Sequence, residues 1–184
     1  MRHVLSNHEE VVKYWAFQRQ EDGRCKNMFF RGPIIYSYGV HFPIARIIGH
    51  TAVFTTQSCS SSTNRHRCYA QRAASHMPMI YVLDPTKNAE AQFEWTCNQV
   101  ITLLESAKRA RVNKPYLIKR AESKVADFNT YARLTSLTPV QIPTELTVDM
   151  LKQLLTDRDV ARQREAKLGQ MRHRVMHGAS RYSY

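Results

Sequence analysis

The sequence lacks any run of about 18 apolar residues, the length that a helix needs to cross a bilayer, so we expect no transmembrane helix. It also lacks a hydrophobic segment near its start, because MRHVLSNHEE turns acidic at once. Secretion through a signal peptide is therefore not expected. Global disorder is not expected either, since 43% of the residues are hydrophobic and 23% are charged.

Cysteine is sparse, with four residues in 184, and none of them forms a C-x-x-C pair. A disulfide framework is typical of small, secreted, cysteine-dense chains, so we interpret these four as free thiols in a reducing compartment. Cys59, His66 and Cys68 can be drawn as zinc ligands, but their spacing matches no common structural zinc site. We expect neither a metal nor another cofactor.

The usual signatures of catalysis are missing too. The chain contains no G-x-x-x-x-G-K-[ST], no G-x-S-x-G and no H-E-x-x-H motif. Residues 25–83 contain neither aspartate nor glutamate, which disfavours nuclease chemistry in which several carboxylates hold a metal ion. Whether the chain is an enzyme stays open at this point.

What the sequence does have is positive charge. Its 27 lysines and arginines exceed its 15 acidic residues, which gives a net charge of +12. The excess is +3 over 1–50, +1 over 51–100, +3 over 101–150 and +5 over 151–184, so it peaks at the C-terminal end. A basic surface attracts phosphate backbones whatever their base sequence, because binding releases counterions. We therefore favour a polyanionic partner over a solvated basic face.

The first part of the chain alternates short elements in a pattern typical of an α+β fold. A helix is predicted over 8–20, with Asn7 as its N-cap and Glu10 in capping-box position. Short runs of aromatic and β-branched residues follow, separated by turn residues, and predict an antiparallel meander over 27–56. Pro43 cannot donate a backbone hydrogen bond, so its strand is expected to lie at an edge or to begin there.

A serine- and threonine-rich segment then leads into a second helix. Ser62 or Thr63 is its expected cap, and its small residues are expected to lie against the sheet. MIYVL at 79–83 predicts a further strand. Together these elements predict an α+β domain over 1–85, in which helices pack on a small antiparallel sheet.

Helical periodicity dominates from about residue 87. The first of these helices carries its apolar residues on one face: Phe93, Cys97, Val100, Ile101, Leu104 and Ala107. Another helix follows a break at Asn113 to Pro115, and two prolines mark 135–143 as a linker or an extended crossing. Beyond about residue 157 the last helix loses nearly all large apolar side chains, so we expect a helix that docks on a partner, or a disordered tail. We predict a mainly helical, basic extension over 86–184.

Polar side chains interrupt the apolar runs of the meander and gather again at the second helix. They are Tyr36, Ser37, Tyr38, His41, Thr63, Arg65 and His66. Strand alternation predicts Tyr36 and Tyr38 on one face and Ser37 on the other. A helix start after a Ser/Thr loop presents free amides and a partial positive charge, which favour an anion. We hypothesise that this helix start folds back against the tyrosine-histidine hairpin.

Three interpretations of this cluster stay open. In the first, the tyrosines are ordinary sheet residues, His41 lies in a turn and the Ser/Thr loop only caps a helix. In the second, the cluster is a binding pocket for a phosphate or nucleotide, formed by Tyr36, Ser37, Tyr38, Thr63 and Arg65. In the third, His41 and His66 act as general acid and base in phosphodiester cleavage, assisted by a tyrosine.

Three segments within 8–76 also carry a family resemblance. The chain contains a W-x-x-Q helix, an I-Y-S-Y-G-x-H-F segment and an S-x-T-x-x-H element in fixed order. In these three segments the chain resembles a family of bacteriophage-borne proteins with no assigned activity. The matching positions are Trp15, Gln18, Tyr36, Ser37, Tyr38, Gly39, His41, Phe42, Thr63 and His66. The resemblance implies a phage or phage-like origin and a location in the host cytoplasm or the virion, but no activity.

Charge and resemblance together predict a phage accessory protein that binds nucleic acid or another polyanion without catalysis. The residues expected to bind it are Arg109, Arg111, Lys119, Arg120, Arg162, Arg164, Arg172 and Arg174. One alternative is a phosphodiester- or nucleotide-processing enzyme that uses His41 and His66. The other is a virion or assembly component, or a homo-oligomer, whose basic C-terminal helix docks on a neighbouring subunit.

Overall fold

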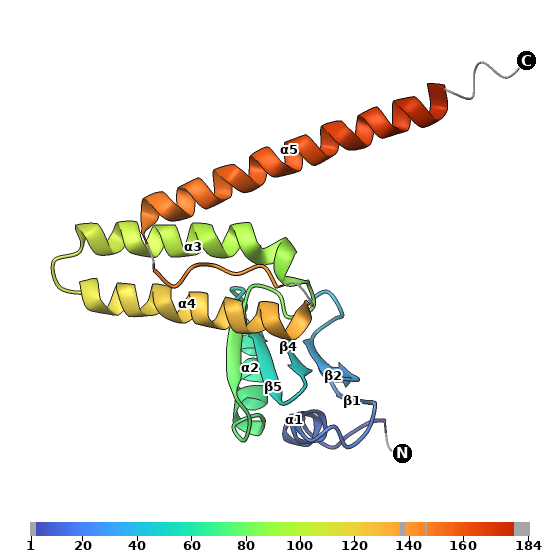
Figure 1. The fold of residues 1–184 in the computed structure, drawn as a ribbon. Helices are drawn as coiled ribbons and strands as arrows, with labels where there is room; N and C mark the ends of the chain where they lie inside the picture. The colour runs from blue at the N-terminus through green and yellow to red at the C-terminus, as the bar shows by residue number, and fades with distance from the viewer. Residues whose placement is uncertain (1–2, 137–138, 146, 179–184) are drawn as a thin grey trace, which may run out of the picture. The chain divides into compact units, whose positions relative to one another are not determined.

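A computed structural model of the chain describes residues 3–136, 139–145 and 147–178, with side chains up to residue 173. Residues 1–144 and 145–184 form two compact units. The predicted α+β class is confirmed, because the first unit combines a mostly antiparallel sheet with helices (Figure 1). All six strands of the described residues precede the boundary expected after residue 85, whereas the first compact unit continues to residue 144.

The sheet of the described residues has six strands that lie side by side in chain order. They are β1 (Asp22–Cys25), β2 (Met28–Arg31), β3 (Ile34–Ser37), β4 (Pro43–Ile48), β5 (Thr51–Thr55) and β6 (Met79–Val82). Strands β1 to β5 pair antiparallel, which confirms the predicted meander, and β6 pairs parallel to β5. Strand β4 begins at Pro43, as expected, and β1 is an additional strand that the sequence pattern did not predict.

Helix α1 (His8–Ala16) begins where the sequence predicts. The Asn7 side chain accepts a hydrogen bond from the Glu10 backbone N–H at 2.8 Å, so it caps the helix. The predicted extension to residue 20 is wrong. Gln18 adopts a left-handed backbone conformation with φ of 47°, and its N–H turns back to the Trp15 carbonyl, which ends the helix.

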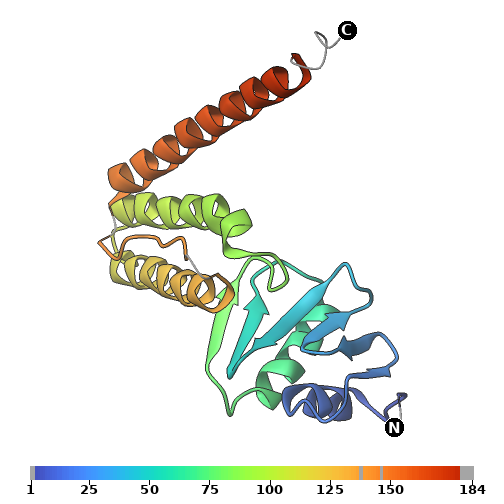
Figure 2. The same ribbon diagram turned by 45° about the vertical axis from the view of Figure 1, so that its right-hand side comes forward.

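Helix α2 (Ser61–Ala73) connects β5 to β6 and lies with α1 on one face of the sheet (Figure 2). Its cap is Ser60, whose Oγ accepts from the Thr63 N–H at 3.3 Å. The expected caps, Ser62 and Thr63, are therefore wrong. They lie inside the first turn, because Ser60 is the last residue with an extended backbone before the helix.

The core of this part fills the space between the two helices and the sheet. Its largest fully buried side chains include Trp15 from α1, Phe30 and Ile35 from neighbouring strands, and Phe54 from β5. The Trp15 ring lies edge-on to Phe54 with centroids 6.3 Å apart, and its Nε1–H donates to the Pro33 carbonyl at 2.8 Å. Alternation along the strands sends these residues to the helix-covered face.

Helices α3 (Ala89–Arg109) and α4 (Lys114–Thr135) form an antiparallel hairpin, side by side in both views (Figures 1 and 2). The predicted apolar face of α3 is confirmed, since all six of its expected residues are buried. Phe93 meets Phe128 of α4 edge-on, with ring centroids 5.8 Å apart. The hairpin joins the sheet through α4, where Asp127 accepts a hydrogen bond from the Tyr81 backbone N–H of β6 at 3.2 Å.

The segment after α4 runs without regular structure in the described residues, as the prolines predict. Asn129 holds it, because its side-chain amide exchanges two hydrogen bonds of 2.8 Å with the backbone of buried Ile142. Helix α5 (Val148–Gly178) belongs to the second unit, and its side chains at 159–173 are all exposed. Within the described chain, no helix combines the length and apolarity that a membrane span requires.

Candidate functional site

The predicted contact between the start of α2 and the hairpin is present, and it centres on Ser37 at the end of β3. Its Oγ lies 2.8 Å from Nδ1 of His66 and 3.2 Å from Oγ1 of Thr63. All three side chains are nearly inaccessible, with exposed fractions of 1%, 5% and 6% for Ser37, His66 and Thr63. Ser37 points toward α2 because it shares the helix-covered face of the strand with Ile35.

The two tyrosines do not share one face of the sheet, so that prediction is wrong. Tyr36 stays in the strand and stacks on Phe29 of β2, with ring centroids 5.0 Å apart. Tyr38 leaves the strand with a left-handed φ of 65°, which turns its side chain toward α2. Its ring stacks on His66 at 5.8 Å, and its hydroxyl donates to Ser62 at 3.1 Å. Tyr36 and Ser37 therefore point to opposite sides of the sheet.

His41 lies apart from this cluster on the exposed turn before β4. Its ring packs over Gly39, where a Cβ atom would come within 2.6 Å of it. In the described part of the chain, no hydrogen bond or ring contact joins His41 to His66. The imidazole beside His66 is instead that of His8 on α1, with ring centroids 4.7 Å apart. Sequence reasoning missed His8, because only the packing of α1 against α2 brings it there.

The surroundings of both rings favour neutral imidazoles. Burial lowers the pKa of His66, and the nearby His8 and Arg65 add to this effect. Burial and Lys26 lower the pKa of His8, against a smaller opposing effect of a backbone hydrogen bond at Cys25. Arg65 itself is exposed on α2.

The serine-histidine pair has the atoms of a nucleophile and its base, but it lacks access. A nucleophile must be reached by its substrate, and the Ser37 side chain is almost completely covered. The Ser37 hydroxyl and Nδ1 of His66 are instead paired with each other by a hydrogen bond. The arrangement is suited to bracing the start of α2 against the end of β3.

This brace predicts acid-sensitive stability. The unfolded chain binds protons at histidine below about pH 6.5, whereas the folded chain resists protonation of His66, so the free energy of unfolding should fall as the pH drops from 7 to 5. His66→Asn keeps a partner for Ser37. It should lower the slope of the free energy of unfolding against pH by an amount that corresponds to up to about one bound proton. Urea unfolding at several pH values measures it. His50→Asn, on an exposed turn, is the control, and an equal slope in wild type and His66→Asn would contradict the prediction.

The predicted nucleic-acid-binding residues of the helical part come together at the end of the α3–α4 hairpin. Residues 106–121 contain six basic side chains and no acidic one. All six are exposed: Lys108, Arg109, Arg111, Lys114, Lys119 and Arg120. Val112 and Tyr116 are exposed among them, by 84% and 64%. We call this surface of residues 106–121 the basic tip.

The predicted binding residues of α5 are placed differently. Arg162, Arg164 and Arg172 are exposed along one helix, and the side chain of Arg174 lies outside the described residues. Acidic residues are interspersed here, and Arg162 lies 3.8 Å from Asp159. The charge of this segment is therefore more balanced than that of the basic tip.

Neither metals nor known proteins add to this description. Among the described residues, no group of three or more histidine, cysteine, aspartate or glutamate side chains could hold a metal ion. No family model, no curated protein and no solved structure matches the chain.

Proposed function

We propose that the protein binds nucleic acid without catalysis, as a phage accessory protein, and that the basic tip is its main contact surface. The observation that carries this proposal is the exposed set of six cations in a stretch of 16 residues without a carboxylate. Glu105 and Glu122 are the nearest acidic residues on either side in the sequence. A solvated helix surface usually mixes both signs, so this separation of charge supports a polyanionic partner.

The geometry of the tip suits a phosphate backbone. The last turn of α3 and the first turns of α4 present their cations from two adjacent helices, joined by a short connection. A duplex carries about one negative charge per 1.7 Å of its axis, so a short length of nucleic acid offers partners for several of these side chains at once. Tyr116 adds an exposed aromatic ring that can stack on an unpaired base.

The absence of catalysis is supported by the buried cluster. His66 and Ser37 are covered by protein, and His41, the other half of the expected acid-base pair, lies on a separate turn. A phosphodiester enzyme of this kind needs its base near the attacking oxygen and its acid near the leaving oxygen of the same phosphate. The cluster therefore favours a structural role for His66.

Salt-dependent binding tests the proposal. The protein, purified until its 260/280 nm absorbance ratio shows no bound nucleic acid, is titrated against a labelled duplex and a labelled single strand at 50 to 200 mM salt. We expect binding to both, with a slope of log K against log salt of about −3 to −5, since each phosphate contact contributes about −0.9 for a duplex. Failure to bind at 50 mM salt, or a slope near zero, would overturn the proposal.

A second candidate, a subunit that docks through α5, is supported by the exposed side chains of residues 159–173, which include Val160, Leu168 and Met171. A helix without a buried face gains stability when a partner covers it. Light scattering of the nucleic-acid-free protein distinguishes the two candidates. A defined oligomer that dissociates when residues 159–184 are removed favours docking, and a monomer favours the first proposal.

A further inference from the structure

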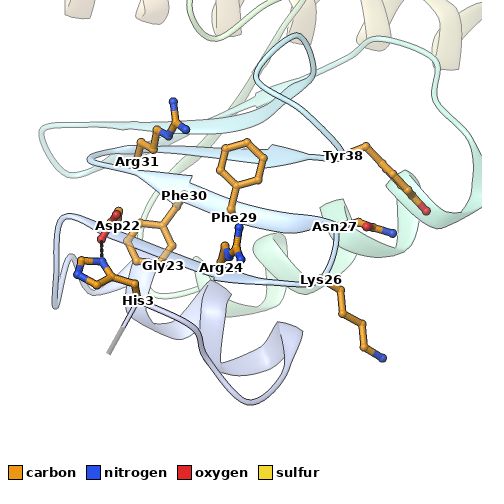
Figure 3. Close-up of a pocket in the computed structure, with 10 residues that line it drawn as sticks. All are labelled: His3, Asp22, Gly23, Arg24, Lys26, Asn27, Phe29, Phe30, Arg31 and Tyr38. Carbon is orange, nitrogen blue, oxygen red and sulfur yellow. Dashed lines mark hydrogen bonds and ion pairs between the residues drawn. The ribbon is translucent and has the colours of Figure 1, made fainter. Parts of the chain in front are cut away.

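A hollow lies at the edge of the sheet, where β1, β2 and the end of β3 meet (Figure 3). Its volume is about 430 Å³, within the range of sites that hold small ligands. Its lining combines aromatic, cationic and amide side chains: Arg24, Lys26, Asn27, Phe29, Arg31 and Tyr38, with His3 and Asp22 at one side. The basic tip contributes none of these residues.

Two aromatic rings border the hollow. Phe29 stands on β2 and Tyr38 projects from the end of β3, with Asn27 below Tyr38 in the view of Figure 3. Phe29 is half-buried, and Tyr38 is 53% exposed. An exposed aromatic face is a stacking surface for a nucleobase, and an amide side chain can bond the polar edge of a base.

Tyr38 is held in place before any ligand arrives. Its hydroxyl donates to Ser62, its ring lies on His66, and its backbone N–H donates to the Asn27 carbonyl at 2.6 Å. Its left-handed backbone is unusual for a bulky residue, and neighbouring Lys26 is left-handed too, with φ of 51°. The buried Ser37–His66 brace thus supports the position of one wall of the hollow.

The charge of the hollow is complementary to phosphate. Three cations line it, and Asp22 is its single carboxylate. Asp22 is already engaged, because its Oδ1 lies 2.5 Å from Nδ1 of His3. The Arg31 guanidinium carbon lies 5.7 Å from the centroid of the Phe29 ring, so cation and aromatic ring are adjacent. A ligand with a flat ring and a phosphate matches both features.

We propose that this hollow accepts one unpaired nucleotide of a single-stranded nucleic acid, with its base beside Phe29 and its phosphate near Arg24, Lys26 or Arg31. The inference rests on the proposed nucleic-acid binding and adds the preferred form of the ligand. A duplex keeps its bases stacked inside the helix and cannot place one in the hollow. The protein therefore binds a single strand through both surfaces and a duplex through the basic tip alone.

The test compares a labelled 12-nucleotide single strand with the matching 12-base-pair duplex by fluorescence anisotropy. Phe29→Leu removes the stacking ring and leaves every charge in place. We expect it to weaken single-strand binding by about tenfold, while duplex affinity and its salt slope stay unchanged. Phe17→Leu is the matched control, because Phe17 is 54% exposed on the chain after α1 and lines no part of the hollow.

A second readout uses the unaltered protein. A single strand that carries 5-iodouracil is irradiated in the complex, and the crosslinked peptide is identified by mass spectrometry. We expect the crosslink within residues 24–38. The absence of any crosslink within residues 24–38, or an equal loss of single-strand and duplex affinity in Phe29→Leu, would overturn this inference. The proposed function would still stand if duplex binding keeps its salt slope. If neither form of nucleic acid binds, the proposed function fails, and this inference fails with it.

Discussion

Neutralising the basic tip should weaken nucleic-acid binding by about 100-fold at 50 mM salt, because several phosphate contacts are lost together. The variant carries glutamine in place of Arg109, Arg111, Lys119 and Arg120, which are all exposed. The slope of log K against log salt should fall in magnitude by about 3 to 4 for a duplex, since each contact contributes about 0.9. Anisotropy titrations at four salt concentrations measure both quantities. The loss should be similar for unrelated base sequences, because phosphate contacts carry no sequence information.

The fold should survive these changes. None of the four side chains is buried, and the Arg109 Nε–H donates to the Glu105 backbone carbonyl of its own helix at 3.3 Å. Exposed substitutions of this kind usually change the free energy of unfolding by less than about 0.5 kcal/mol each. Circular dichroism and a urea titration check this point.

A matched variant separates a binding site from overall charge. Lys13, Arg72, Lys87 and Arg133 are exposed on four other parts of the first unit, and replacing them with glutamine removes the same net charge. We expect this variant to lose less than about threefold in affinity, through long-range attraction alone. If both variants weaken binding equally, the basic tip is not a site, and the protein attracts nucleic acid only through its net charge of +12.

The α5 variant gives a third comparison. Replacing Arg162, Arg164, Arg172 and Arg174 with glutamine removes four charges from a segment that also contains Asp159 and Glu165. We expect a smaller loss than at the basic tip, because the acidic neighbours already reduce the local positive potential. A larger loss of affinity than in the basic-tip variant would indicate that the main contact surface lies on the second unit.

Local sequence signals predicted the elements of this fold well. The capping of α1 by Asn7, the meander and the buried face of α3 all depend on residues close in sequence, and all are present. The errors lie where several local solutions compete. Ser60 caps α2, whereas Ser62 or Thr63 was expected. Consecutive serines and threonines are all suitable caps, so the sequence alone does not distinguish among them. Strand β1, DGRC, has no apolar alternation of its own and forms through its pairing with β2.

The candidate sites were predicted only in part. The contact of Ser37 with Thr63 and His66 follows from the expected packing of α2 on the hairpin. The position of Tyr38 could not be predicted, because a single left-handed residue changes the face that its side chain occupies. The hollow also escaped sequence reasoning. Arg24, Phe29 and Tyr36 are cross-strand neighbours only in the register that the two hairpin turns impose.

Trp15→Ala should be the most destabilising single substitution considered for this protein, lowering the free energy of unfolding by about 3 to 5 kcal/mol. Trp15 is completely buried between α1 and the sheet, so its removal leaves a large cavity in the main core. It also leaves the Pro33 carbonyl without the hydrogen bond from Nε1, which adds to the loss. Because domains are typically stable by about 5 to 15 kcal/mol, a loss of this size is a large fraction of the whole.

Two further variants divide this effect into its parts. Trp15→Phe keeps most of the aromatic packing against Phe54 but removes the hydrogen bond, so we expect a smaller loss of about 1 to 2 kcal/mol. Trp95→Ala removes a half-buried tryptophan from α3 and should also destabilise less, because water can enter the space. Urea unfolding followed by far-ultraviolet circular dichroism measures all three.

Trp15 also anchors the strand pair that carries the hollow, because its hydrogen-bond partner Pro33 lies in the turn after Arg31. Trp15→Phe should therefore weaken single-strand binding more than duplex binding. Equal unfolding midpoints for Trp15→Ala and wild type would contradict the packing of α1 on the sheet, from which both the brace and the hollow derive their positions.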